Sequence, residues 1–148
     1  MIQLDIDALN ERFWSRPLSY IAPDGKSVVL SDGRMLVENQ PDDDLDDTQL
    51  WTKWIINPGI STTKSLGRDF SVTQYGTATL QIFIPKGLYT GPGNDLRDQF
   101  NALFRGWVSA DKKLVVSDLK STSSEYKQRF HLINAMINWR SNRLTRRT

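Results

Sequence analysis

The chain has 148 residues, of which 39% are hydrophobic and 10% aromatic, so it can bury the core of one domain and is too apolar to remain disordered. It has no cysteine, which excludes disulfides and thiolate metal sites, and because no run reaches 18 apolar residues we expect no membrane span. The net charge of +2 is unevenly divided: residues 1–50 hold four Lys/Arg against eleven Asp/Glu (−7), and residues 51–148 hold fifteen against six (+9). This asymmetry predicts either interaction surfaces of opposite sign or opposite faces of one solvated domain. The first residues lack the basic and apolar segments of a signal peptide, so we expect action or assembly in a reducing cytoplasm.

The N-terminal segment is predicted to form a helix. Its apolar residues recur at helical spacing, at Ile2, Ile6, Leu9 and Phe13. Pro17 cannot continue a helix and is expected to end it. The turn signals that follow, Pro-Asp-Gly at 23–25 and Asp-Gly at 32–33, predict a small meander of short strands near 18–22, 27–30 and 34–38.

Two polar segments are predicted to be exposed loops. Residues 40–48 (QPDDDLDDT) hold five Asp in nine residues and cannot bury themselves. They lack the Gly and the terminal Glu of a calcium-binding EF-hand loop, so a solvated loop is favoured over a metal site. Residues 50–57 (LWTKWIIN) are typical of a strand, which Asn57-Pro58-Gly59 is expected to stop. The Ser, Thr and Lys of residues 60–69 predict the second loop.

Residues 75–107 carry the clearest structural pattern, a strand followed by a helix. Residues alternate from 77 to 84 as in a half-buried strand that ends at Pro85. One face holds Ala78, Leu80, Ile82 and Ile84, and the other holds Thr77, Thr79, Gln81 and Phe83. The helix is marked by an apolar stripe with a period of 3.6 residues, formed by Leu96, Phe100, Leu103, Phe104 and Trp107. The two apolar faces must pack together, and each buried side chain of the stripe contributes roughly 1.5–3 kcal/mol before entropy is subtracted.

Two more strands are predicted after this helix. Residues 113–119 (KLVVSDL) would complete a β-α-β unit over residues 72–119, and a long final strand would span residues 126–140. The pattern leaves open whether the two strands of the unit are neighbours or parallel. Residues 141–148 are polar and basic, and are expected to form a flexible tail. Together the elements predict one α+β domain over residues 1–148, with a mixed or mostly antiparallel sheet, one main helix packed on it and a second helix at the N-terminus.

The sequence offers little catalytic chemistry, and we expect no enzyme activity, cofactor or metal. His131 is the only histidine and lies on the mostly apolar side of the last predicted strand, where a structural role is favoured over that of a base. Glycines 87, 91 and 93 precede a helix N-terminus, which suits an anion, but Asn94-Asp95 stands where a phosphate loop needs Lys and Ser or Thr. Asn94 is instead predicted to cap the helix.

The order of these features resembles the tail terminator proteins of bacteriophages with long, non-contractile tails, and a phage-related family linked to them. The resemblance covers most of the chain and begins with a helix containing residues 8–13 (ALNERF) and a strand containing Trp54. It continues with the strand at 75–85 (YGTATLQIFIP), Gly87 and the helix with the apolar stripe, and ends with a strand that contains Ile133 and Ile137. Residues 20–38 and 40–48 depart from the family pattern because they are longer than in its compact version.

The resemblance implies a structural virion protein rather than an enzyme. Such proteins form a homohexameric ring at the head-proximal end of the tail, stop polymerisation of the tail tube and provide the joint to the head connector. The implied partners are further copies of the chain, the tail tube protein and a head-completion or connector protein, with assembly in the host cytoplasm. DNA passes through the ring without sequence-specific binding, and no membrane is involved.

Three alternatives remain open from the sequence, and the last of them is a hydrolase that would have to use His131. The first is another head–tail joining protein, such as a neck or head-completion protein. The second is a small nucleic-acid-binding domain, because the chain is mildly basic and places Lys53 between Trp51 and Trp54. Against this second reading, the chain has no RNP-like motif, and the acidic segment would repel phosphate.

In a ring of this kind, the charged segments are candidates for contacts between copies or for the channel wall. A head-to-tail ring joins two different patches of each subunit, and opposite charges there aid encounter and register. The candidate interface or channel residues are Asp42, Asp43, Asp44, Asp46, Asp47, Lys64, Arg68, Arg143, Arg146 and Arg147.

Replacing the five aspartates of residues 42–47 by asparagine is expected to impair ring assembly, head joining or DNA passage. The change removes the negative charge that would either pair with a neighbouring copy or keep DNA from adhering to the channel wall. Particle assembly and infectivity measure the effect, and particles that assemble and infect normally would contradict the assignment.

Overall fold

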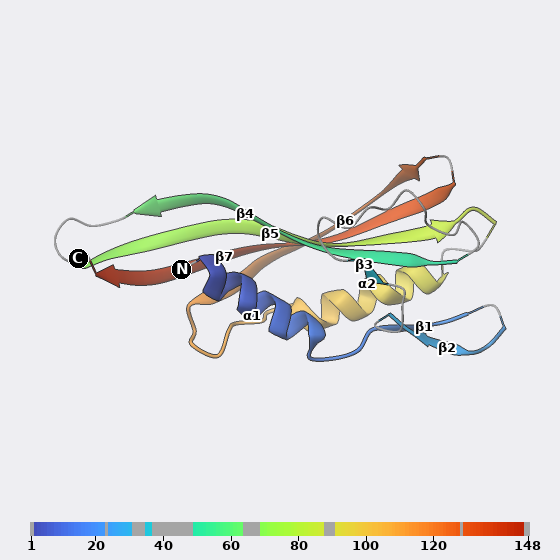
Figure 1. The fold of residues 1–148 in the computed structure, drawn as a ribbon, viewed down its shortest axis with the longest axis horizontal. Helices are drawn as coiled ribbons and strands as arrows, with labels where there is room; N and C mark the ends of the chain where they lie inside the picture. The colour runs from blue at the N-terminus through green and yellow to red at the C-terminus, as the bar shows by residue number, and fades with distance from the viewer. Residues whose placement is uncertain are drawn as a thin grey trace.

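The computed structural model describes residues 2–22, 24–30, 35–36, 49–63, 69–87, 91–127 and 129–146. It confirms the predicted α+β class, with two helices and a sheet that dominates the fold (Figure 1). The elements in chain order are α1 (Ile2–Trp14), β1 (Ser19–Ile21), β2 (Ser27–Val29), β3 (Met35–Leu36), β4 (Trp51–Thr63), β5 (Asp69–Pro85), α2 (Gly91–Phe104), β6 (Leu114–Tyr126) and β7 (Phe130–Arg146).

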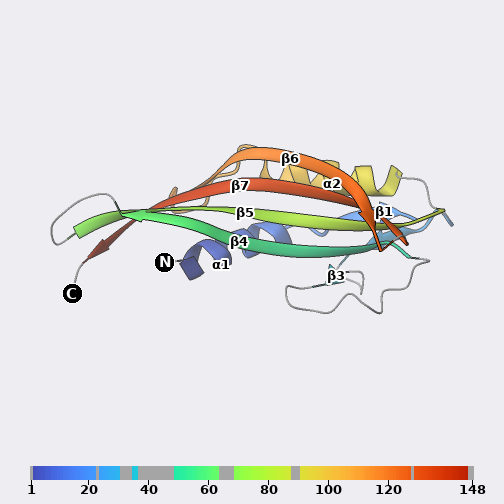
Figure 2. The ribbon, with the colours of Figure 1, turned by 90° about the horizontal axis from the view of Figure 1, so that it is seen from above.

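The main sheet has five strands in the order β3-β4-β5-β7-β6. Every neighbouring pair is antiparallel except β3 and β4, which are parallel. The predicted β-α-β unit is present as β5, α2 and β6, but β7 lies between its two strands and is antiparallel to both. The strands of the unit are therefore parallel without being neighbours, and the four long strands run side by side along the molecule (Figure 2).

Both helices pack on one face of this sheet (Figure 1). The predicted apolar faces meet there, because the even-numbered residues from Ala78 to Ile84 and the stripe from Leu96 to Phe104 share one buried cluster. Helix α1 joins the same cluster through Phe13, whose ring stacks on Trp54 with centroids 4.3 Å apart. The indole N–H of Trp54 donates to Asn10 Oδ1 at 2.8 Å, which ties α1 to β4.

A second, smaller cluster lies on the opposite face at one end of the sheet. Phe83, which the alternation placed among polar residues, is only 1% exposed there and contacts Phe130 and Tyr126 edge-on. Leu36 of the short strand β3 and Leu132 of β7 complete the cluster. This end of the sheet therefore buries side chains on both faces, which a simple alternation of apolar and polar residues does not reveal.

Three local predictions are wrong. The short strands do not form one meander: β1 pairs with β2, whereas β3 pairs with β4 in the main sheet. Strand β4 does not stop at Pro58 but continues through a register shift between Pro58 and Ser61. A proline is tolerated because β4 pairs there only with β5, so its other side is an edge among the described residues. Helix α2 begins at Gly91, so Asn94 lies inside its first turn and is not its cap.

At one end of the sheet three strands continue past α2 and form an arm, made of residues 57–63 of β4, 69–75 of β5 and 141–146 of β7 (Figure 1). The base of the arm contacts α1 through Ser141 and Arg143. Residues 60–63 and 69, expected in a loop, and residues 141–146, expected in a flexible tail, are therefore strand residues. In β4 polarity misled the prediction, because all of residues 57–63 are exposed and no buried side marks a strand period. In β7 the buried residues Ser141 and Arg143 are themselves polar, so no apolar pattern marks the strand there. Residues 40–48, 64–68 and 147–148 lie outside the described part of the chain.

Strand β6 forms the edge of the main sheet opposite β3. Its residues 117–125 are exposed except for Leu119, which is partly buried. Most of them are Ser, Thr or charged. A register shift between Val116 and Asp118 interrupts the pairing of this edge strand with β7.

Gly76→Ala is expected to destabilise the fold by about 1–3 kcal/mol, the usual cost of inserting a group into a packed site. Gly76 pairs with Trp139 where the arm begins, and a Cβ there would collide with the Trp139 ring and lie 2.7 Å from the carbonyl oxygen of Asn57. Urea unfolding measures the change, with the exposed strand substitution Ser121→Ala as control. A Gly76→Ala protein as stable as the wild type would contradict this packing.

Candidate functional site

One predicted interface residue, Arg143, lies at the centre of a buried ion-pair network. Its Nε and Nη2 donate to Oδ1 of Asp5 at 2.9 and 2.8 Å, and its Nη1 donates to Oδ2 of Asp111 at 2.7 Å. The other Asp5 oxygen accepts the hydroxyl of Ser141 at 2.6 Å. Asp5 is 1% exposed and Arg143 8% exposed, so the structure places Arg143 inside the chain and not on an open surface.

A turn just before β6 holds the side chain of Asp111 in position to meet Arg143. The Ser109 hydroxyl and the Lys113 backbone N–H both donate to Asp111 Oδ1, at 2.6 and 3.0 Å. The bond from Ser109, the bond from Arg143 and the Lys113 N–H hold the pKa of Asp111 well below its usual range. Burial alone would lower the pKa of Arg143, but its hydrogen bonds to Asp111 and Asp5 raise it above the ordinary value. Asp111 and Arg143 therefore stay charged, and the hydrogen bonds of the network join α1, this turn and β7.

The remaining predicted site residues give no contact geometry. Arg146 is the last residue of β7, where its backbone pairs with Asp69. The five aspartates of residues 42–47, together with Lys64, Arg68 and Arg147, lie outside the described residues. Their assignment to an interface or channel stays a prediction.

An open groove of about 380 Å³ runs beside α1 and is bounded by the network. Leu4, which is 56% exposed, and Trp107 give it an apolar lining. Arg12 lies at its edge, with Nε donating to the Leu103 carbonyl at 2.9 Å and its guanidinium 5.9 Å from the Trp107 ring. Burial and the nearby charge of Arg16 lower the pKa of Arg12.

A second hollow, of about 530 Å³, lies at the base of the arm. It is lined by Gly59, Ile60, Tyr75, Gly76, Thr77, Ser117, Asn138 and Trp139. Ile60 is 75% exposed and Tyr75 45% exposed, so both are large apolar side chains that the described part of the chain leaves open to solvent. The amide of Gln74 donates to the carbonyls of Gly59 and Tyr75, at 3.1 and 3.0 Å, and so holds the irregular part of β4 against β5.

Sequence reasoning missed this hollow because it took Pro58-Gly59 as the end of a strand. The pair instead occupies the register shift that turns Ile60 outward beside Tyr75. The available sequence signal is an isoleucine directly after a Pro-Gly pair that follows a strand pattern, because a bulge can re-aim a side chain without ending the strand.

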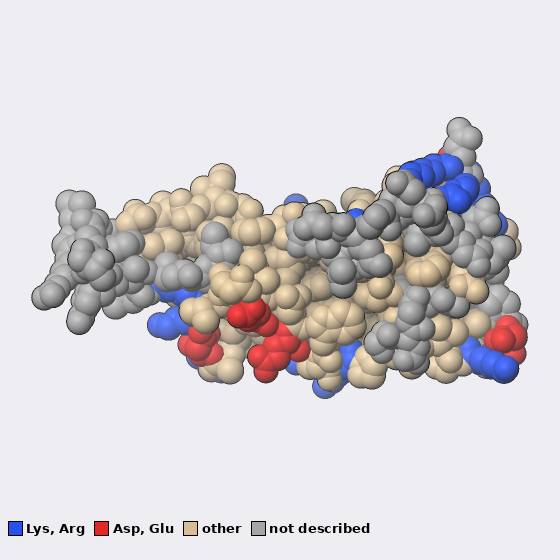
Figure 3. All heavy atoms as spheres, in the orientation of Figure 1, with Lys and Arg blue, Asp and Glu red and all other residues tan. Residues whose placement is uncertain are grey.

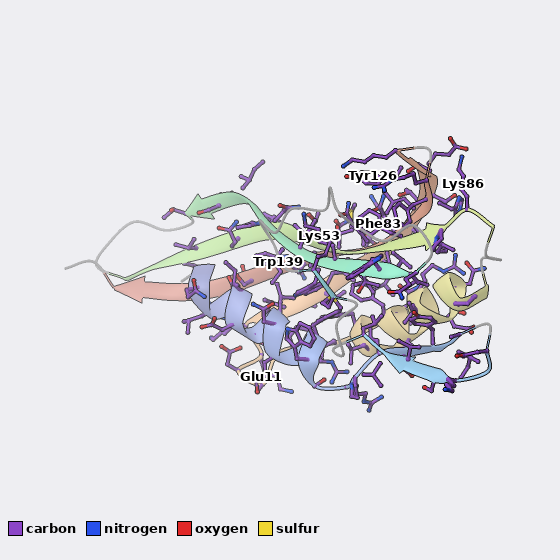
Figure 4. All side chains as sticks on the ribbon, turned by 45° about the vertical axis from the view of Figure 1, so that its right-hand side comes forward. Glu11, Lys53, Phe83, Lys86, Tyr126 and Trp139 are labelled. Atoms are coloured by element: carbon purple, nitrogen blue, oxygen red, sulfur yellow. The ribbon has the colours of Figure 1, made fainter. Side chains whose placement is uncertain are left out.

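Charged side chains gather at separate places on the face seen in Figure 3. Asp and Glu atoms lie mainly over the lower edge, where α1 runs, and Lys and Arg atoms gather at the end that holds the turn between β6 and β7. At that end Lys86 pairs with Glu125 at 3.2 Å, and Figure 4 places Lys86 near Tyr126. Glu11 of α1 points away from the sheet in the same view, while Trp139 lies at the middle of the sheet.

These surfaces offer apolar contact, hydrogen bonds and fixed charge. Within the described residues, no group of three or more His, Cys, Asp or Glu is placed to hold a metal ion. None of the described helices has the length and apolar character needed to cross a membrane. His131 is partly buried in β7, between Ile84 of β5 and Glu125 of β6.

Comparison with known proteins gives a fold without a function. No family model matches the sequence, and no curated protein matches it. One similar solved structure has a TM-score of 0.61 at 11% sequence identity, and the match covers 95% of each chain. At this identity the similarity shows the fold alone.

Arg143→Met is expected to destabilise the protein by about 3–5 kcal/mol, because it leaves the Asp5 carboxylate buried without its cation. Thermal and urea unfolding measure the loss. The matched control is Lys86→Met, which breaks an ion pair whose side chains are 47% and 67% exposed and should cost about 1 kcal/mol or less. Equal effects of the two substitutions would show that the Arg143 network adds no more than a surface pair.

Proposed function

We propose that this chain is a structural subunit of a virion, the tail terminator of a long-tailed bacteriophage. It assembles as a ring, in the expected form a homohexamer, on the head-proximal end of the tail tube, ends tube polymerisation and provides the joint to the head connector. The observation that carries the proposal is the order of sequence features, above all the strand and helix at residues 75–107, which resembles that family over most of the chain.

The exposed arm supports a role in assembly. Residues 57–63 have no buried member, and the arm leaves Ile60 and Tyr75 open to solvent. Exposed apolar residues that lie together often mark a protein–protein contact, and Ile60 and Tyr75 line the same hollow. The groove beside α1 and the hollow of the arm are different surfaces of one chain, as a head-to-tail ring requires.

The proposed partners follow from this position in the virion. They are neighbouring copies of the chain, the tail tube protein on one side and a head-completion or connector protein on the other. DNA passes through the ring and is not read by sequence. No catalytic step is part of the proposal.

Electron microscopy of phage tails tests the proposal directly. Tails made with the wild-type gene should end in a ring of this protein at the head-proximal end, with native mass spectrometry of the released ring giving six copies. Without the gene, tail tubes should grow beyond their normal length and fail to join heads. Tails of normal length without the protein, or a ring found in the neck but not on the tube, would overturn the terminator assignment.

A further inference from the structure

We propose that Trp14 at the end of α1 in one copy inserts into the hollow between Ile60 and Tyr75 of the next copy. This inference rests on the proposed self-assembly and names the contact that carries it. The occupant of the hollow is thus a second copy of this chain, bound head to tail.

The hollow suits a bulky apolar side chain. Gly59 and Gly76 line the hollow together with Thr77 and Asn138, and the exposed side chains of Ile60 and Tyr75 give it apolar walls. Its volume of about 530 Å³ exceeds that of any single side chain, so an indole fits together with part of the helix end that presents it. The hydrogen bonds from Gln74 fix the bulged backbone, so the hollow exists before a partner arrives.

Trp14 is a rigid and exposed anchor. It is 47% exposed, although its ring already meets Phe13 edge-on with centroids 5.0 Å apart. Phe13 in turn stacks on Trp54 in the core, so the ring that Trp14 contacts is itself held in place by the core. Tryptophan is enriched among the residues that dominate binding energy at interfaces, because it buries a large area at little cost in side-chain entropy.

The charges around the two surfaces are complementary. On α1, Glu11 precedes Trp14 by one turn and the exposed Arg16 follows it. At the hollow, the exposed Arg140 is paired in register with Tyr75, and the exposed Asp118 is paired with Asn138. One acid and one base therefore flank the indole, and one base and one acid flank the hollow. Docking places Glu11 near Arg140 and Arg16 near Asp118.

The two surfaces also lie on different layers of the molecule. Tyr75 and Thr77 alternate with residues that face the helices, so they belong to the open face of the sheet, whereas Trp14 belongs to the helix layer. One copy thus offers Trp14 on one side and the hollow on the other. A contact between unlike patches repeats from copy to copy and closes a ring when the rotation permits.

Two single variants and their mixture test the contact. Trp14→Asp and Ile60→Asp should each weaken self-association about thirtyfold or more and give monomers where the wild type forms rings, as measured by sedimentation velocity alone and with tail tubes. Mixed 1:1, the two variants should form heterodimers and nothing larger, because Ile60→Asp still carries Trp14 and Trp14→Asp still carries the hollow. Ile21→Asp is the matched control. Ile21 is 53% exposed on the β1–β2 hairpin, outside both proposed surfaces, so this change should leave self-association at the wild-type level.

Thermal unfolding of every variant shows whether weaker self-association comes from loss of the contact or from loss of the fold. The milder variants Trp14→Ala and Ile60→Ser are included for the same purpose. A charge exchange tests the proposed ion pair between Arg16 and Asp118. Arg16→Asp or Asp118→Arg alone should weaken self-association several-fold, and the two changes together should restore it. Rings formed by Trp14→Asp or Ile60→Asp, or a mixture that stays monomeric, overturn this contact and leave the proposed function standing. A wild-type chain that is monomeric both alone and with tail tubes overturns both.

Discussion

The pairing of β5 with β7 is the constraint on which the rest of the structure depends. The two strands are antiparallel along their whole length, from Asp69 opposite Arg146 to Pro85 opposite Phe130. Because β7 fills the place between β5 and β6, helix α2 must cross over it, and this crossing lays the helix stripe on the even-numbered residues of β5. The same pairing continues past α2 and makes the arm, so the core and the arm are two parts of one long ribbon.

The sequence predicts this architecture well where one side of an element is buried. The periods at Ile6–Phe13, at Ala78–Ile84 and at Leu96–Phe104 each identify an element, because burial imposes a repeat of 3.6 or 2 residues. Residues 57–63 of the arm have no such repeat, because all of them are exposed, and their strand forms through pairing with the distant strand β5. The site escaped prediction for the same reason: Arg143 meets Asp5 across 138 positions of sequence, and the hollow comes from a bulge that composition does not reveal.

The Arg143 network shows how a polar group is placed at the boundary between core and arm. A buried ion pair is a poor source of stability, because the desolvation of its charges offsets much of their attraction. Its geometry is demanding instead, since Asp5, Asp111 and Ser141 must all be in place to satisfy it. The network thereby fixes the positions of α1 and of the turn before β6 relative to the arm. These two elements line the groove.

The edge formed by β6 has a consequence for how concentrated copies behave. Unpaired strand edges recruit one another and lead to aggregates, and long flat apolar edges do so most readily. Here the edge is rich in Ser and Thr, carries Asp118, Lys120 and Glu125, and is interrupted by a register shift near Val116. These features disfavour pairing of this edge with the edge of another sheet, so the described β6 edge is protected against sheet-to-sheet aggregation.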